Sequence, residues 1–359
     1  MRLEANMGSM GETSSGIQLP VIDISDMTPE VGKKLLQAAR EYGFLYIDTN
    51  GTGFMERMVE REFELSRNFF ALPEAEKEAC RIDHSNRGWA GLQGEILDPQ
   101  RQRKGDFKEV FNIGELRDGQ PQQPMPKALE KYVDELVQFE ARCRAVCNRI
   151  LDLLALGLEV EEPTFFSSRH TQPSGCTVRW LYYPAIPADS DYQPEVDVRA
   201  GAHSDYGSIT LLFQRPSQPG LEIRTSEDEW APVPVIPDGY KTSATLPPIL
   251  VNIGDLLSYW TNGLLKSTVH RVIFPRQARR GGEDRYSIAY FCHPADDADL
   301  VPVPSKLVAQ RILEDGTEVG YGGGAATKRA ITAREHLTNR LEATYGFRMN
   351  KAGQPGTAA

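Results

Sequence analysis

Short runs of β-branched and aromatic residues, punctuated by proline and glycine, fill the chain from Gly175 onward. The runs read TVRWLYYP, SITLLFQ, LEIRT, PILVNIG, STVHRVIF, YSIAYF and LVPVP. Many short, closely spaced strands are typical of a sandwich or barrel, in which alternate side chains point inward. Strands do not alternate with helices here, which disfavours a doubly wound nucleotide-binding fold. The sequence therefore predicts a mainly β core.

The first third of the chain has a different texture, because its apolar residues recur at helical spacing. The predicted helices cover residues 29–40, 53–70, 73–79 and 127–158, and a last one covers 331–345. The predicted strands of this part cover residues 19–24 and 43–48. Helices are therefore expected to flank the β core.

Charge and hydropathy limit the kinds of molecule that the protein is expected to bind. The chain carries 40 Lys+Arg against 50 Asp+Glu, a net charge of −10, whereas nucleic-acid binding needs a basic face. No stretch approaches the roughly 18 to 20 consecutive apolar residues of a membrane helix, and the N-terminus lacks the apolar segment of a signal peptide. Five scattered cysteines indicate reduced thiols. We therefore expect a cytoplasmic protein without nucleic-acid or membrane partners.

Two of the histidines stand in a pattern that suits a metal. His203 and Asp205 lie in GAHSDYGSIT, where their spacing at the start of a predicted strand puts both side chains on one face. His270 lies in STVHRVIF, on a later strand that the barrel can bring back beside the first. Two imidazoles and one carboxylate on one face of an octahedron, with open positions opposite, select non-haem Fe(II). The sequence thus predicts an iron site.

A third element follows in RYSIAYF. Arg285 and Ser287 are two residues apart on one strand, so both side chains point to the same side. An arginine inside a barrel is costly unless it meets an anion, and a guanidinium beside a hydroxyl suits a carboxylate. The pair is therefore a candidate anchor for an organic acid.

Together these motifs resemble the isopenicillin N synthase-like family of iron(II)/2-oxoglutarate-dependent dioxygenases. The resemblance spans residues 19–345 and also rests on LPVIDIS, GFLYI, FFALP, RGWAGLQGEILDP, GDFKEVFNIG, LYYP and ILVNIGDLLSYWTNG. It implies a double-stranded β-helix, or jelly roll, flanked by helices. The expected organisation is a disordered segment (1–17), a helix-rich N-terminal region (18–125), the long helix with the jelly-roll core and C-terminal helix (126–346), and a tail (347–359).

The resemblance also implies roles for the motif residues. The implied iron ligands are His203, Asp205 and His270, and the implied contacts of 2-oxoglutarate are Arg285, Ser287 and Tyr183. With Fe(II), 2-oxoglutarate and O2, such an enzyme oxidises a small organic molecule by hydroxylation, desaturation or ring formation and releases succinate and CO2. Secondary metabolism is the setting that the resemblance suggests.

Two departures from the family pattern keep a second hypothesis open. Leu181 stands where many members have asparagine, and NKAGQP resembles the tail of isopenicillin N synthase, with Gln354 at the position of a glutamine that can occupy the iron. Both features fit an iron oxidase that uses no 2-oxoglutarate. A third hypothesis is a noncatalytic barrel that binds a small acid or carries a structural zinc, although structural zinc sites have four protein ligands.

Strand alternation predicts which side chains face the substrate. If Tyr183 points inward, Leu181 and Arg179 do too, and Arg285 similarly implies Phe291. Arg179 either meets an anionic group of the substrate or forms an ion pair with an acidic neighbour, while Phe291 offers an apolar wall. The sequence does not identify the substrate or the oligomeric state.

Overall fold

The computed structural model describes residues 17–83, 85–186, 190–193, 196–226, 229–241, 246–274, 283–315 and 330–345. The predicted disordered segment before residue 17 and the predicted tail, with Gln354, lie outside the described residues, so both stay predictions. No helix among the residues described is long and apolar enough to cross a membrane.

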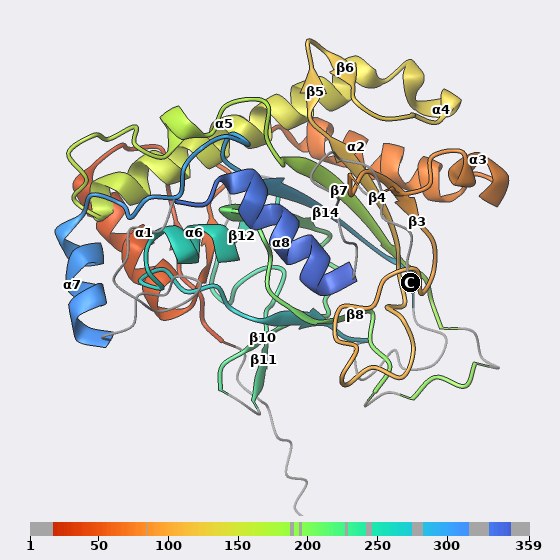
Figure 1. Cartoon of the computed structure of the whole chain (residues 1–359). Coiled ribbons are helices and arrows are strands. Elements are labelled where there is room, and N and C mark those ends of the chain that lie inside the picture. The colour runs from red at the N-terminus through yellow and green to blue at the C-terminus, as the bar shows by residue number, and fades with distance from the viewer. Residues whose placement is uncertain are drawn as a thin grey trace, which may run out of the picture.

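Two β-sheets face each other and form the core (Figure 1). The larger sheet contains, in spatial order, β1 (Val21–Ile22), β2 (Phe44–Ile47), β12 (Ile249–Ile253), β9 (Ile209–Gln214), β14 (Arg285–Cys292), β7 (Thr177–Tyr183), β4 (Glu109–Gly114) and β3 (Gly88–Ala90). The smaller sheet contains β11 (Trp230–Pro232), β10 (Leu221–Arg224), β13 (His270–Val272) and β8 (Ala200–His203). A separate hairpin joins β5 (Leu116–Arg117) to β6 (Gln120–Pro121).

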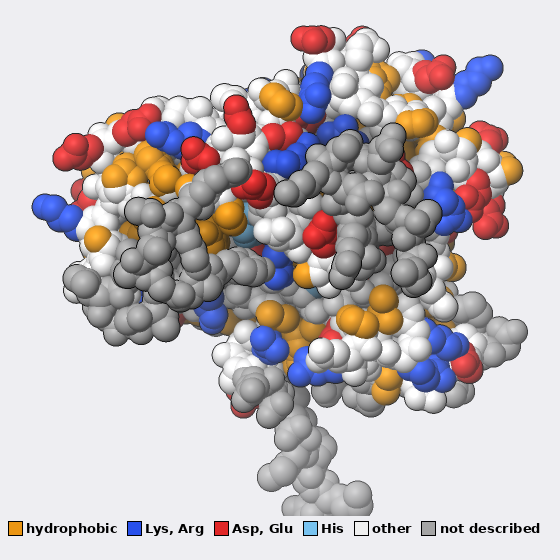
Figure 2. Space-filling view, viewed as in Figure 1, with side chains coloured by type: hydrophobic (Ala, Val, Ile, Leu, Met, Phe, Trp, Pro, Cys, Tyr) orange, Lys and Arg blue, Asp and Glu red, His pale blue; other side chains and the backbone are white. Residues whose placement is uncertain are grey.

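Helices flank this core and confirm the predicted arrangement. They are α1 (Pro29–Glu41), α2 (Glu56–Phe70), α3 (Glu74–Glu78), α4 (Lys127–Glu130), α5 (Val133–Gly157), α6 (Asp255–Trp260), α7 (Lys306–Asp315) and α8 (Ala333–Tyr345), with a 3₁₀ turn at Ser167–Arg169. In Figure 1, α5 and α2 lie along the large sheet, where they pack against β14, and α8 crosses in front of the strands. On the same face of the molecule, Figure 2 shows acidic and basic side chains interspersed among the described residues.

The predicted alternation of side chains holds along the strands. On β14, Ile288 and Tyr290 belong to the core beneath the helices, whereas Ser287 and Ala289 line a cavity between the two sheets. On β12, Val251 likewise joins the helix-side core. Because helices cover one face of the large sheet, its other face, toward the smaller sheet, is left to build a site inside the barrel.

Glycines set the contact between α1 and α5. A Cβ at Gly157 would lie 2.3 Å from the carbonyl oxygen of Gly32, and a Cβ at Gly32 would lie 2.5 Å from the carbonyl oxygen of Leu153. The backbones of α1 and α5 therefore approach as closely as glycine alone allows.

Thr28 caps α1 by accepting a hydrogen bond from the backbone N–H of Val31.

Three expectations about the elements are wrong. The helix predicted over 127–158 is divided into α4 and α5, because Tyr132 leaves helical geometry and its ring lies 4.5 Å below the guanidinium of Arg61. The run LVPVP at 300–304 is not a strand, since its two prolines lack the N–H that a ladder needs. Asp205 follows the end of β8 and does not begin a strand.

Candidate metal and cosubstrate site

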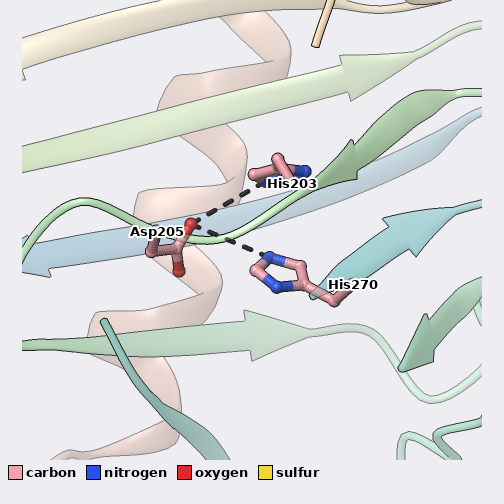
Figure 3. Close-up of side chains that lie close together, drawn as sticks. All are labelled: His203, Asp205 and His270. Carbon is pink, nitrogen blue, oxygen red and sulfur yellow. Dashed lines mark ion pairs between the residues drawn. The ribbon is translucent and has the colours of Figure 1, made fainter. Parts of the chain in front are cut away.

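Three potential metal ligands converge between the sheets (Figure 3). His203 ends β8 and His270 begins β13, and the two residues are directly opposite in the antiparallel pair. Their rings lie 4.3 Å apart between centroids. Oδ1 of Asp205 lies 3.8 Å from Nε2 of His203 and 3.7 Å from Nε2 of His270. One ligand atom from each residue therefore falls within 4.8 Å of the other two.

Hydrogen bonds point the histidine Nε2 atoms at this common centre. Nδ1 of His203 donates to the carbonyl oxygen of Gly201 at 2.8 Å, and Nδ1 of His270 donates to that of Thr268 at 3.2 Å. We assign these tautomers from the carbonyl partners, which can only accept. Burial and the neighbouring His270 lower the pKa of His203 to about 4. His203 is therefore neutral at pH 7, as a metal ligand must be.

Neutral donors hold the far oxygen of Asp205. Its Oδ2 accepts hydrogen bonds from Thr210 at 2.6 Å and from Nδ2 of Asn252 at 2.7 Å, which leaves Oδ1 facing the imidazoles. Burial alone would raise the pKa of Asp205, but His270, His203 and these hydrogen bonds hold it below its usual value. The carboxylate is thus charged, and its hydrogen-bond partners orient it as the partners of metal ligands do.

The donor set fits Fe(II). Two imidazoles and one carboxylate approach from one side, and the described residues bring no fourth His, Cys, Asp or Glu into the group. A closed structural zinc site would need that fourth ligand. Three cavities border the group, and His203 and Asp205 together line two of them. The arrangement therefore leaves room for small molecules beside the ion.

Arg285 lies in the inner of these cavities, which measures about 70 Å³. It is 2% exposed and donates to Ser287 Oγ at 3.2 Å, to Oε1 of Gln214 at 3.2 Å and to the carbonyl oxygen of Gln218 at 3.0 Å. The ring of Tyr183 lies 4.8 Å from its guanidinium carbon. No Asp or Glu in the described part of the chain forms an ion pair with Arg285, and burial lowers its pKa.

A second buried arginine adds positive charge near Arg285. Burial and, to a smaller extent, the positive charge of nearby Arg285 lower the pKa of Arg199 to about 10. Its guanidinium lies over the ring of Phe274 at 4.6 Å and donates to the carbonyl oxygen of Glu283 at 3.0 Å. An anion that entered this part of the inner cavity would therefore meet buried positive charge that no described carboxylate pairs with.

The outer cavity measures about 290 Å³ and extends from His203 and Asp205 toward α8. Arg179 and Phe291 line both cavities, whereas Leu181 lines only the inner one. Arg179 forms an ion pair with Glu95, the alternative that the sequence left open. The predicted contacts of these three side chains with substrate stay predictions.

Sequence reasoning missed a buried cluster of four charges beside the site. We call Glu95, Asp106, Lys108 and Arg179 the balanced cluster, because it holds two carboxylates and two cations. Nζ of Lys108 lies 3.1 Å from Oε2 of Glu95 and also contacts Asp106. Oδ1 of Asp106 accepts from the backbone N–H of Gly201 at 3.0 Å, two residues before His203. The alternation of Asp106 and Lys108 in GDFKEVFNIG was the available signal.

Comparisons with known proteins agree with this geometry. Residues 19–133 match the family described as non-haem dioxygenase in morphine synthesis N-terminal. Residues 174–294 match the 2OG-Fe(II) oxygenase superfamily. The second match contains His203, Asp205, His270 and Arg285.

Individual relatives extend over almost the whole chain. A UPF0676 protein of Schizosaccharomyces pombe is 34% identical, over 95% of this chain and 97% of its own length. The 2-oxoglutarate-dependent dioxygenase htyE of Aspergillus rugulosus is 30% identical, over 87% of this chain and 92% of its own.

A solved structure supports the fold. The crystal structure of a full-length Neurospora crassa protein in complex with alpha-KG has a TM-score of 0.72 and 27% identity, and the match covers 91% of this chain and 97% of that one. The jelly-roll core and the cofactors Fe(II) and 2-oxoglutarate are thereby confirmed. The chain belongs to the 2-oxoglutarate- and iron(II)-dependent oxygenase superfamily and is an oxidoreductase that oxidises a small organic molecule.

Proposed function

We propose that Nε2 of His203, Oδ1 of Asp205 and Nε2 of His270 hold the catalytic Fe(II). The observation that carries this proposal is the convergence of these three atoms beside two cavities. Bound Fe(II) supplies the coupled oxidative decarboxylation of 2-oxoglutarate by O2 and the oxidation of substrate. The protein supplies fixed tautomers on both histidines and a fixed orientation of Asp205, so that the ligands need no rearrangement.

We propose further that Arg285, Ser287 and Tyr183 bind the carboxylate of 2-oxoglutarate that lies away from the metal. The Arg285 guanidinium and Ser287 hydroxyl offer several donors, and no carboxylate among the described residues competes for the guanidinium. Leu181, Leu212 and Val272 line the same cavity and exclude water from it. In such surroundings an ion pair with a bound acid is stronger than in water.

The outer cavity is the proposed place of the substrate. It adjoins the proposed iron ligands, and Phe291 and Arg179 are proposed to contact the substrate there. Hydroxylation, desaturation and ring formation all begin with removal of a hydrogen from a substrate carbon, and they differ in whether that carbon then gains oxygen, forms a double bond or closes a ring. We propose a role in secondary metabolism, which the matched morphine-synthesis family supports. Five free, buried cysteines support work in a reducing compartment, for which we propose the cytoplasm.

The test is replacement of Asp205. Asp205→Ala is expected to abolish both stoichiometric Fe(II) binding and substrate-dependent formation of succinate. Asp238→Ala, at an exposed position, is the matched control and should leave both unchanged. Unaltered turnover by Asp205→Ala would overturn the proposed iron site. Succinate formed per product distinguishes the 2-oxoglutarate-dependent reaction from that of an oxidase, which forms none.

A further inference from the structure

Three arginines line the outer cavity, and two of them already have carboxylate partners. Arg179 is paired with Glu95, and Arg334 is paired with Asp296 at 2.6 Å. Arg87, just before β3, is the third. Its side chain forms no hydrogen bond or ion pair with any of the residues that the structure describes. Among the described residues, this guanidinium is therefore the one in the cavity wall that no hydrogen-bonded or ion-paired carboxylate neutralises.

The side chain of Arg87 packs closely against Gly114. A Cβ at Gly114, the last residue of β4, would lie 2.4 Å from Nε and 3.0 Å from Cζ of Arg87. The guanidinium thus lies directly over the backbone of Gly114, in space that only a glycine leaves open. This contact restricts the side chain against the cavity wall.

The two carboxylates that act electrostatically on Arg87, Glu115 and Asp296, are already engaged by other groups. Glu115 accepts from the backbone N–H of Ser174 at 3.0 Å and lies 3.3 Å from Nε of Arg117, and Asp296 is held by Arg334. Partial burial and the like charges of Arg117 and Arg334 lower the pKa of Arg87, and the more weakly acting charges of Glu115 and Asp296 offset only part of this effect. A bound anion would remove this unfavourable balance.

We infer that the substrate is a small carboxylic acid whose carboxylate binds Arg87 while its apolar body fills the outer cavity beside the proposed iron ligands. This inference rests on the proposed function. One uncompensated guanidinium matches one negative charge, and its planar fork matches a carboxylate with two parallel hydrogen bonds. The remaining wall includes Leu97, Phe291, Leu337 and Leu341, which suit an apolar body. The volume of about 290 Å³ is just below the lower limit of about 300 Å³ for ligand sites, which favours a small ligand.

The experiment compares acids with their neutral amides. Wild-type protein is loaded with Fe(II) and 2-oxoglutarate under nitrogen, so that the Arg285 site is filled, and calorimetric titrations follow. The probes are 3-phenylpropionate against 3-phenylpropionamide, and hexanoate against hexanamide. We expect at least one acid to bind roughly 30-fold more tightly than its amide, because the amide cannot neutralise Arg87.

Variants assign the preference to one side chain. Arg87→Gln is expected to remove the roughly 30-fold preference for the acid, whereas Arg87→Lys retains part of it because the charge remains. Arg81→Gln, which removes an exposed guanidinium paired with Glu78, is the matched control and should preserve the preference. Affinity for 2-oxoglutarate should be the same in all four proteins, which also shows that each is folded.

Three results would overturn the inference: equal binding of acid and amide by wild type, binding of no acid, or an undiminished preference in Arg87→Gln. Failure of the proposed function gives a different result. In that case, Fe(II)-loaded wild-type protein would not bind 2-oxoglutarate when its affinity is measured before the acids and amides are added.

Discussion

Two groups of buried charge border the same inner cavity as His203, Asp205 and His270, and they are built in opposite ways. The balanced cluster satisfies its charges internally, since Lys108 and Arg179 both meet Glu95, and Lys108 also meets Asp106. Arg285 is equally buried, but its partners among the described residues are neutral oxygens.

The difference separates structural charge from charge meant for a ligand. A buried ion pair that is complete leaves nothing for a ligand to neutralise, whereas a buried cation without an anion destabilises the empty protein and favours binding of an acid. Removing a cation should therefore cost stability in the first group and ligand affinity in the second.

The largest effect is expected at Arg285. Arg285→Met should weaken 2-oxoglutarate binding by roughly two to four decades, about 3 to 5 kcal/mol, because the acid loses its charged partner in a buried site. Its unfolding free energy should change much less than this, since the partners that Arg285 leaves inside the protein are neutral oxygens and not carboxylates. Calorimetry with 2-oxoglutarate and urea unfolding measure the two quantities.

Arg215→Met is the matched control for this change, because Arg215 is partly exposed and paired with Glu60. It should bind 2-oxoglutarate as wild type does. If Arg285→Met bound the cosubstrate with unchanged affinity, the claim that the unpaired charge of Arg285 serves ligand binding would be wrong.

The converse change is Lys108→Met. Lys108 is 3% exposed, and its loss leaves Glu95 and Asp106 buried with less positive charge. We expect the unfolding free energy to fall by about 3 to 5 kcal/mol, measured by urea unfolding. The double variant Glu95→Gln/Lys108→Met should lose less than Lys108→Met alone. A single variant as stable as wild type would show that the cluster is not structural.

The balanced cluster also predicts how stability depends on pH. Burial alone would raise the pKa of Glu95, but Arg179 and Lys108 hold it at about 2, below the ordinary value near 4.5. Its contribution is therefore complete above about pH 4.5 and is lost as the pH falls toward 2, by about 3 kcal/mol. Unfolding free energies measured between pH 6 and 3 should fall less steeply in Glu95→Gln than in wild type, and equal slopes would contradict this assignment.

The smallest expected effect concerns Asp205, the carboxylate of the proposed iron site. Thr210→Val removes one of the two neutral donors to its Oδ2. Fe(II) affinity should fall by about 10- to 100-fold, as when other metal ligands lose a hydrogen-bond partner, and competition with a chelator measures it. Thr225→Val, at an exposed position, is the control. Unchanged Fe(II) affinity would mean that Asn252 alone orients the carboxylate.

Features carried by local pattern could be predicted from the sequence. The β14 alternation indicated that Arg285 and Ser287 share a face, and both line the inner cavity. The acidic partner of Arg179 in the balanced cluster could not be predicted, because Glu95 and Arg179 come from segments far apart in the sequence and meet only in the folded chain. Arg87 was hidden for the same reason, since its isolation depends on where Glu115 and Asp296 find their own partners.

Strand β2 has a consequence for how the enzyme is made. Phe44 packs edge-on against His270 at 5.5 Å, and Thr268 donates to the carbonyl oxygen of Tyr42, 226 residues earlier. The backbone that presents His270 is thus held by β2 and by Tyr42, which lies two residues before it. This segment leaves the ribosome long before His270 does. Contacts of such separation form late and slowly, so the nascent polypeptide has to keep β2 available until β12 and β13 have been synthesised.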